Sequence, residues 1–271
     1  MLRYFAIYIF TLLIIFLATI SCQSKKKSKY ILAPFTELDT LSTNDWWNRK
    51  TSPIISMKVP RDQVIAFGIY TTSNNTLKLS AQLFPLYPEE SRIVKLAFYI
   101  DNTWKVVQTE QVNEIGWSVL FRIDNWEVNK NIKYKLIHGK KAFFEGLIRK
   151  DPINKAEIKL AALSCNSNKD RGNRDEYVRN INTLDPDLIF FAGDQSYDHK
   201  EHTAAWIKFG LQFRELFRDR PCITIPDDHD IGQGNLWGEG GKKSMRKDGN
   251  DGGYFFHPEY VKMVERAQTA H

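Results

Sequence analysis

Three short segments of this sequence combine residue types that bind metal ions or transfer protons. Ser164-Cys165 supplies a thiol, Asp194 and Tyr197 stand three residues apart, and residues 227–230 read Asp-Asp-His-Asp. Clustered carboxylates repel each other and raise each other's pKa unless a cation compensates them. Oxygen, nitrogen and sulfur donors together suit iron or zinc beside a second divalent ion. The chemistry expected of these segments is therefore metal-dependent.

Each segment alone has an ordinary structural explanation, so the inference depends on the conjunction. A single cysteine such as Cys165 is most often a small buried side chain. A Gly-Asp pair such as Gly193-Asp194 is common in turns and helix starts. Three acids within residues 227–230, directly after an apolar run, make a poor core. The three segments together favour a metal site.

The elements that must carry these segments form a β-α-β-α-β unit. We expect strands over residues 156–163, 188–192 and 221–225, with a helix in each interval. The continuous apolar run at 188–192 is typical of a buried parallel strand. Crossover helices make such strands parallel, and ligands of parallel sheets bind beyond the carboxyl ends of the strands. All three segments follow a strand end and should meet at one edge of the sheet.

The helices of this unit are expected to be amphipathic. The first follows a polar loop at 166–173 and stops at Asp185-Pro186, with an apolar stripe of Tyr177, Ile181 and Leu184. The second places Trp206, Phe209, Phe213 and Leu216 on one face. A further helix begins at Pro258.

Residues 46–150 show a different pattern, with hydrophobic residues at period two between frequent turn signals. Seven short strands are expected, near 64–70, 77–83, 93–100, 104–108, 117–123, 132–136 and 142–148. This number and spacing predict a β-sandwich of the immunoglobulin or fibronectin type, whose Trp and Tyr residues fill the core. A sandwich domain of this type does not by itself indicate a chemical activity.

The N-terminus has the pattern of an export signal. Arg3 precedes seventeen mainly apolar residues, 4–20, and Cys22 follows at once after small and apolar residues. This resembles a bacterial lipoprotein signal in which Cys22 becomes the lipidated N-terminus. An uncut signal anchor is the alternative, and in both cases the chain is exported to the cell envelope and tethered to a membrane. The Lys-rich stretch 23–29 reads as a flexible tether.

The charge distribution argues against a nucleic-acid-binding surface. The chain has 271 residues and a formal net charge of +6, and Arg3 with four lysines before residue 30 supplies five of these charges. The remainder is nearly neutral, whereas nucleic-acid-binding domains are usually basic over a whole face. We expect no specific nucleic-acid binding.

Two further cysteines, Cys165 and Cys222, remain, and in an exported protein a disulfide between them is the default expectation. Cys222 precedes Asp228 by six residues, about 20 Å along an extended strand, whereas Cys165 should lie at the metal end of the sheet. A bridge requires Cα atoms within about 7 Å. We therefore expect both thiols to be free.

The motifs resemble those of the alkaline phosphatase D (PhoD-like) branch of the calcineurin-like metallophosphoesterases. The resemblance rests on Leu163-Ser164-Cys165, on Phe191-Ala192-Gly193-Asp194-Gln195-Ser196-Tyr197, and on Pro226-Asp227-Asp228-His229-Asp230. That family also places a small β-sandwich before its catalytic domain. The resemblance implies hydrolysis of a phosphomonoester or phosphodiester outside the cytoplasm by a water that two metal ions activate.

The resemblance also implies a ligand set. Cys165 and Tyr197 would ligate a ferric or otherwise tightly bound ion, iron or zinc. Asp194 would bridge that ion to a second divalent ion such as calcium, manganese or zinc, and Asp228 would be a ligand of the second ion.

His229 would contact the phosphate and assist the leaving group, with Asp230 orienting its ring. The glycine-rich segment that follows adds basic side chains for a weak contact with anionic substrate, namely Lys242, Lys243 and Arg246. A solvated loop without such a contact is the alternative for that segment.

The expected organisation is a signal peptide at 1–21, a tether at 22–34, a β-sandwich at 35–152 and the N-terminal half of a metallophosphoesterase domain at 153–271. The family completes its site with later histidines, one alone and then a G-H-x-H pair. We therefore expect this chain to be a fragment that is inactive without them. Two alternatives stay open: a noncatalytic exported lipoprotein that binds a ligand through its sandwich, and a nuclease or nucleotidase of the same superfamily.

Overall fold

The structure of this chain is a computed structural model. It describes residues 54–167, 172–198, 201–231, 242–246, 251–254, 256 and 258–271. The expected signal peptide at 1–21, the tether at 22–34 and Cys22 lie outside these residues. Within the part of the chain that is described, no helix has the length and apolar character needed to cross a membrane.

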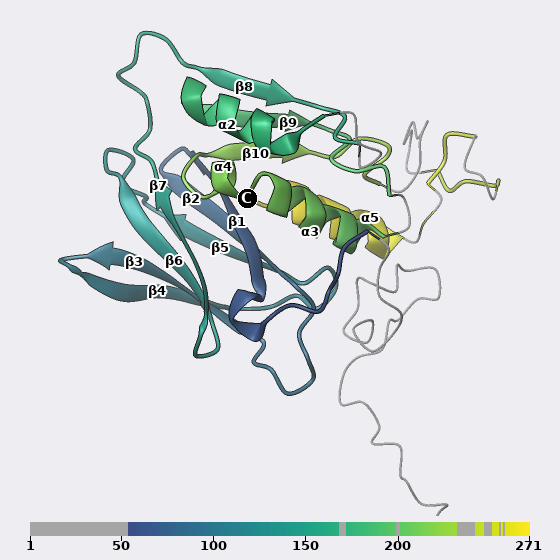
Figure 1. The fold of residues 1–271 in the computed structure, drawn as a ribbon, viewed down its shortest axis with the longest axis horizontal. Helices are drawn as coiled ribbons and strands as arrows, with labels where there is room; N and C mark the ends of the chain where they lie inside the picture. Colours follow the sequence, from purple (N-terminus) through teal and green to yellow (C-terminus); the bar gives the residue numbers. More distant parts are fainter. Residues whose placement is uncertain are drawn as a thin grey trace, which may run out of the picture. The chain divides into compact units, whose positions relative to one another are not determined.

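Seven strands form two antiparallel sheets (Figure 1). A three-stranded sheet has the order β1-β2-β5, with β1 at Ile65–Ser73, β2 at Thr76–Leu83 and β5 at Ser118–Asp124. A four-stranded sheet has the order β4-β3-β6-β7, with β3 at Ile93–Ile100, β4 at Thr103–Gln111, β6 at Ile132–His138 and β7 at Ala142–Ile148. Each lies where the period-two pattern predicts a strand.

The two antiparallel sheets bury aromatic side chains between them. Tyr70 of β1 meets Tyr134 of β6 edge to face, with ring centroids 6.3 Å apart. Both rings are fully buried, and burial raises the pKa of each phenol. These aromatic residues belong to the core, as the sequence predicts.

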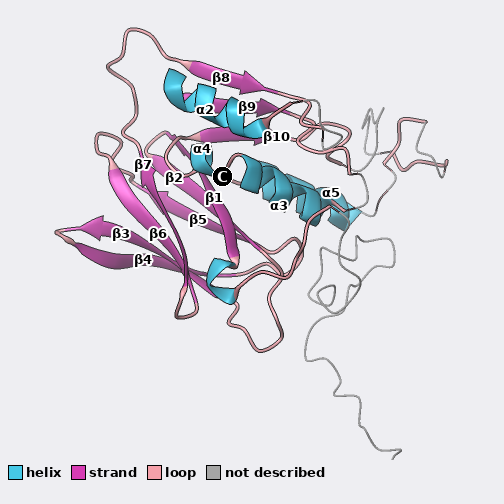
Figure 2. Ribbon diagram, viewed as in Figure 1, coloured by secondary structure: helices cyan, strands magenta, loops and turns pink. Residues whose placement is uncertain are grey.

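The third sheet is parallel and has the order β10-β9-β8. Its strands are β8 at Leu160–Leu163, β9 at Leu188–Ala192 and β10 at Cys222–Ile225. Figure 2 shows the helices beside these strands: α2 at Arg174–Leu184, α3 at His202–Gln212, α4 at Arg214–Phe217 and α5 at Pro258–Thr269. The predicted β-α-β-α-β order is confirmed. The first strand is shorter than predicted, because its pairing with β9 begins only at Leu160.

The predicted stripe of α2 is wrong at two of its three positions. Tyr177 and Leu184 are exposed, whereas Ile181 is buried and Val178 packs beside it against the core. The stripe of the next helix is confirmed, since Trp206, Phe209, Phe213 and Leu216 are all buried. That helix is interrupted at Phe213, whose backbone angles of φ −110° and ψ 11° separate α3 from α4.

The parallel part and the antiparallel part share one hydrophobic core. Phe67 of β1 packs edge to face on Trp206 of α3, with centroids 5.6 Å apart. A Cβ at Gly210 would lie 1.8 Å from Phe67 Cε1, so only glycine allows α3 to approach β1 so closely. The sheet β1-β2-β5 is therefore a middle layer, with the four-stranded sheet on one side and α3 on the other. This layering fixes the parallel strands in place.

One face of the parallel sheet is left uncovered by these helices. Alternate residues of its strands share this face, and their exposure ranges from partial to high: Leu160, Ala162, Leu188, Phe190, Ala192, Ile223 and Ile225. The opposite face, with Ile189, Phe191 and Cys222, is buried. Parallel sheets in proteins are usually covered on both faces.

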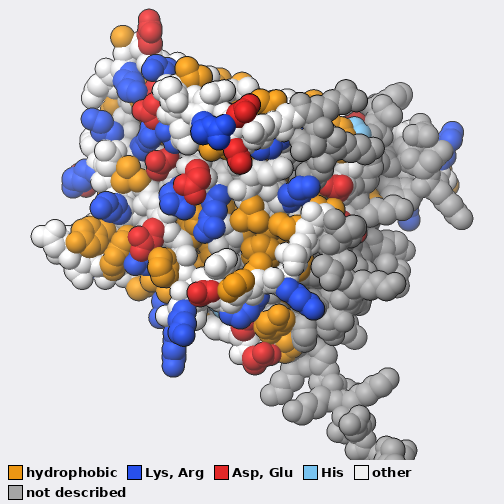
Figure 3. All heavy atoms as spheres, viewed as in Figure 1, with side chains coloured by type: hydrophobic (Ala, Val, Ile, Leu, Met, Phe, Trp, Pro, Cys, Tyr) orange, Lys and Arg blue, Asp and Glu red, His pale blue; other side chains and the backbone are white. Residues whose placement is uncertain are grey.

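Charges of both signs are interspersed on the face of the molecule that Figure 3 displays. Lysine and arginine side chains lie beside aspartate and glutamate over the strands there. Ion pairs between neighbouring strands include Lys135 of β6 with Glu145 of β7, at 2.6 Å.

Candidate metal centre

Three loops meet at the carboxyl edge of the parallel sheet, as its strand order requires. They comprise residues 164–167 after β8, 193–198 after β9 and 226–231 after β10. The Asn166 N–H donates to the Asp194 carbonyl at 2.8 Å, and the Cys165 N–H donates to the Gly193 carbonyl at 3.3 Å. These bonds hold the first two loops side by side.

The backbone at these strand ends takes the left-handed conformation at three positions. Cys165 has φ +59° and Asp194 has φ +56°, which costs an L-residue roughly 1–2 kcal/mol each. Gly193 has φ +88°, and a Cβ there would lie 2.5 Å from Cβ of Asp227. Backbone strain of this kind concentrates at functional sites.

The side chains of the first two loops meet around one carboxylate. Asp194 is 8% exposed, and its Oδ2 accepts a hydrogen bond of 2.9 Å from the Tyr197 hydroxyl. Cys165 Sγ lies 3.8 Å from the same oxygen. The other oxygen, Oδ1, is buried and has no hydrogen-bond partner among the described residues. Buried polar atoms are rarely left unpaired, so this oxygen points to a ligand.

The third loop brings a second carboxylate and an imidazole to this group. One ligand atom each from Asp194, Asp228 and His229 all lie within 4.8 Å of one another. The His229 ring packs on the Tyr197 ring, with centroids 4.2 Å apart. The structure thus brings together all five residues that the sequence placed at the metal ions and the phosphate. Whether His229 is a ligand or a proton donor stays a prediction.

The protonation of Tyr197 fits a site built for a cation. Desolvation raises the pKa of its phenol, and the neighbouring Cys165 and Asp194 raise it further. The phenol therefore keeps its proton, which it shares with Asp194 in the hydrogen bond. A nearby cation reverses this preference, because it stabilises the phenolate. The thiol, the phenol, two carboxylates and the orphaned Oδ1 fit a metal ion by donor chemistry.

Asp230 ties two of the loops together from beneath. Its carboxylate is 2% exposed and accepts backbone N–H bonds from Gln195 and Ser196 at 3.2 Å and from Asp227 at 3.1 Å. Burial raises the pKa of Asp230 to about 6, and the hydrogen bonds from the backbone N–H groups and from the Gln268 side chain oppose that shift. The orientation of the His229 ring by this carboxylate would be an additional contact and stays a prediction.

Asn166 is a site residue that the sequence reading missed. It is 8% exposed, and its Nδ2 donates to the Gln195 carbonyl at 3.2 Å and to Gln212 of α3 at 3.0 Å. Its Oδ1 accepts from Arg174 Nε at 2.6 Å. Nothing in a polar loop marks one asparagine as buried, and its place next to Cys165 was the only available signal.

The free thiols are confirmed: Cys165 is exposed, Cys222 is buried, and neither forms a disulfide. Burial raises the pKa of the Cys222 thiol, which keeps it neutral.

The basic side chains proposed for substrate contact, Lys242, Lys243 and Arg246, are exposed. The Lys242 carbonyl accepts a bond of 2.7 Å from the Tyr254 N–H, which pairs their segment with residues 251–254. Their contact with substrate stays a prediction.

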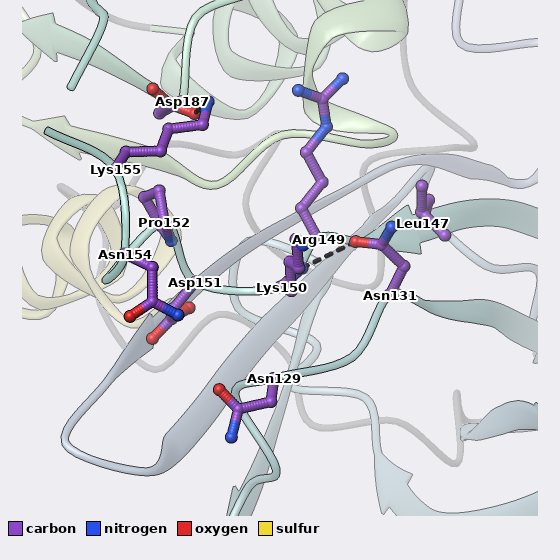
Figure 4. A pocket seen from close by; sticks show the side chains of 10 residues that line it. All are labelled: Asn129, Asn131, Leu147, Arg149, Lys150, Asp151, Pro152, Asn154, Lys155 and Asp187. Atoms are coloured by element: carbon purple, nitrogen blue, oxygen red, sulfur yellow. Dashed lines mark hydrogen bonds and ion pairs between the residues drawn. The ribbon is translucent and has the colours of Figure 1, made fainter. Parts of the chain in front are cut away.

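A cavity of about 790 Å³ lies away from the strand-end cluster (Figure 4). It is lined by Asn129, Asn131, Leu147, Arg149, Lys150, Asp151, Pro152, Asn154, Lys155 and Asp187. Lys155 pairs with Asp187, and Asn131 Oδ1 accepts from the Lys150 N–H at 2.8 Å. Asp187 directly precedes β9 whereas Asp194 follows it, so this cavity lies at the opposite end of the strand from the candidate metal centre.

No family model and no curated protein matches the chain. Among solved structures, PhoD is similar to it with a TM-score of 0.58 and 16% identity, over 78% of this chain and 46% of that one. The purple acid phosphatase isolated from yellow lupin seeds is similar with a TM-score of 0.50 and 12% identity, over 73% of this chain and 39% of that one. The chain spans less than half the length of either structure. At these identities the similarity establishes a shared fold with two phosphatases.

Proposed function

We propose that this chain is the N-terminal part of a PhoD-like metallophosphoesterase, an exported enzyme that hydrolyses phosphate esters. The buried Asp194 carboxylate carries this proposal, because one of its oxygens is orphaned amid a thiol, a phenol and a second carboxylate. The fold shared with two phosphatases supports the same class. In this proposal residues 35–152 form the immunoglobulin- or fibronectin-like sandwich, and residues 153–271 belong to the catalytic domain.

The contacts around Asp194 support the ligand roles that the family resemblance implies. Its Oδ2 lies beside the thiol of Cys165 and the phenol of Tyr197, so these three groups would hold one ion. Asp228 and the same Asp194 carboxylate would hold the second ion, so Asp194 would be shared by the two ions. Bound together, such ions lower the pKa of a water and stabilise charge on phosphoryl oxygens.

The remaining side chains position groups and move protons. His229 packs on Tyr197, and in this proposal its ring donates a proton to the leaving oxygen. Asp230 holds the loop with Asp194 against the loop with Asp228 through three backbone N–H bonds. The left-handed turns at Cys165 and Asp194 bring their side chains together before any ligand binds.

Metal analysis and a substrate panel test this function. The 271-residue chain should bind Zn²⁺ or Co²⁺ but turn over phosphate esters negligibly. A longer version that carries a downstream G-H-x-H pair should show chelator-sensitive hydrolysis of p-nitrophenyl phosphate or its diester. A longer version without bound metal or hydrolysis would favour a noncatalytic binding module. Preferential cleavage of nucleotides or nucleic acid would favour a nuclease or nucleotidase.

A further inference from the structure

A buried amide network lies directly beneath the candidate metal centre. Gln195 follows Asp194 in the chain and is 1% exposed. Its Nε2 donates to the Ile225 carbonyl at the end of β10 at 2.7 Å and to Gln268 Oε1 at 3.1 Å. Gln268 lies in α5, 73 residues along the chain, and is also 1% exposed.

The other side of Gln268 reaches two further elements. Its Oε1 accepts from Gln195, so its Nε2 is the donor toward His202 Nε2 at 3.2 Å. Burial lowers the pKa of His202 to about 3, which keeps this ring neutral and able to accept. The Gln268 carbonyl accepts a hydrogen bond from the Thr224 hydroxyl in β10. The Gln268 side chain also forms a hydrogen bond with Asp230 of the loop after β10. One residue of α5 therefore contacts the loops after β9 and β10, the strand β10 and the first turn of α3.

We propose that Gln268 is a positioning residue of the metal centre, which holds the backbone of Asp194 in place through the side chain of Gln195. This proposal rests on the proposed metallophosphoesterase function. It goes beyond it by assigning a site role to α5, an element that carries no expected metal ligand.

The network has no spare hydrogen-bond partners to replace those of Gln268. Gln195 Oε1 is already buried without a partner among the described residues. Without the Gln268 amide, His202 Nε2 loses its donor and Gln195 Nε2 keeps only the Ile225 carbonyl. Partly satisfied buried networks are costly, so the chain should move to satisfy these groups. We expect the Asp194 turn next to Gln195 to move, because a strained backbone conformation persists only where the surrounding structure holds it.

Gln268→Met tests the proposal, since methionine keeps the side-chain length and removes the hydrogen bonds of the amide. The matched control is Val264→Ala in the same helix, which loses buried volume in the separate cluster of Tyr260 and Met263. Hydrogen exchange by mass spectrometry should show faster exchange at residues 193–198 in Gln268→Met and unchanged exchange there in Val264→Ala. Titration with Co²⁺ should show an affinity weakened by about 10–100-fold only in Gln268→Met, the usual effect of losing a residue behind a metal ligand.

A double-mutant cycle separates positioning from general packing. If the network acts as a unit, Gln195→Met with Gln268→Met should weaken Co²⁺ binding no more than the larger single change. Wild-type exchange at residues 193–198 in Gln268→Met, or equal effects of Gln268→Met and Val264→Ala, would overturn the proposal. A wild-type chain that binds no Co²⁺ would refute the metal function itself, and the exchange measurement would still decide whether Gln268 fixes this loop.

Discussion

The Tyr197 hydroxyl donates a hydrogen bond of 2.9 Å to Asp194 Oδ2, and the Cys165 thiol approaches the same oxygen. The bond satisfies one oxygen of a buried carboxylate and leaves the other without a partner. It also places two predicted ligands in contact, and the phenol of Tyr197 becomes a stronger metal ligand when it loses its proton. In the proposed metal centre, a cation would take the place of this phenolic proton.

Asp194→Asn should remove most of the bound metal, because an amide brings no charge to offset a cation. His229→Asn should leave most of the metal in place and reduce turnover in the longer version of the protein. Metal content by mass spectrometry after dialysis decides between the two roles. Metal lost in His229→Asn and kept in Asp194→Asn would show that the ligand and the acid are interchanged.

Gly193→Ala should destabilise the fold and displace the loop of Asp227. The substitution forces an L-residue into φ +88° and places its Cβ 2.5 Å from Cβ of Asp227. Gly139→Ala is the matched control, since φ is +58° there and the new Cβ has no heavy atom within 4 Å. Urea unfolding should show a loss of about 1–2 kcal/mol for the control, from strain alone, and a larger loss for Gly193→Ala. Equal losses of unfolding free energy in the two variants would mean that the Asp227 loop moves away from the new Cβ without destabilising the fold.

Cys22→Ala should leave an unprocessed precursor in the membrane fraction if Cys22 is the lipidated residue. The lipoprotein signal resemblance motivates this expectation, because the cysteine follows directly on the apolar segment 4–20. Labelling with a radioactive fatty acid should be lost in the variant. Cleavage and release of the variant as an ordinary secreted protein would contradict the anchor.

Leu160→Gln with Ile223→Gln should reduce the binding of a fluorescent dye that reports exposed hydrophobic surface. Both side chains lie on the uncovered face of the parallel sheet, at 55% and 38% exposure, so little buried area is lost. The unfolding free energy should change by less than about 0.5 kcal/mol per site. Met245→Gln is the control, since Met245 is 86% exposed and lies outside that sheet. A control effect as large as that of the double variant would show that the dye does not bind preferentially to this face.

The sequence pattern predicted where the strands lie. It also predicted that Cys165, Asp194 and Asp228 lie close together, because crossover helices make the strands parallel, so that their carboxyl ends share one edge. It could not show the left-handed turns, since neither cysteine nor aspartate marks such a conformation as glycine does. The α2 stripe was misread because Val178 and Ile181 offer an equally good helical spacing as Tyr177 and Ile181. Gln268 could not be found, because its partner is 73 residues away and a glutamine in a helix is ordinarily a surface residue.

The stability of the fold should fall as the pH drops, in part through His202. Its pKa lies at about 3 in the folded chain and at its ordinary 6.5 in the unfolded chain. Between these values the unfolded state binds one more proton, so this residue lowers the unfolding free energy by up to about 1.4 kcal/mol per pH unit on acidification. His271 acts in the same direction, and Asp230, with its raised pKa of about 6, acts in the opposite one, so the variant must be compared with the wild type at each pH.

His202→Gln isolates this contribution, because glutamine stays neutral and its carbonyl oxygen can still accept from Gln268. Urea unfolding at pH 8.5, 7.5, 6, 5 and 4 should show that the unfolding free energy of the variant rises relative to that of the wild type at each step below pH 6.5. The difference should be constant above pH 7, where His202 is neutral in both states, which provides an internal control. A difference that stays constant down to pH 4 would mean that the buried ring is reached by water and accepts a proton in the folded chain.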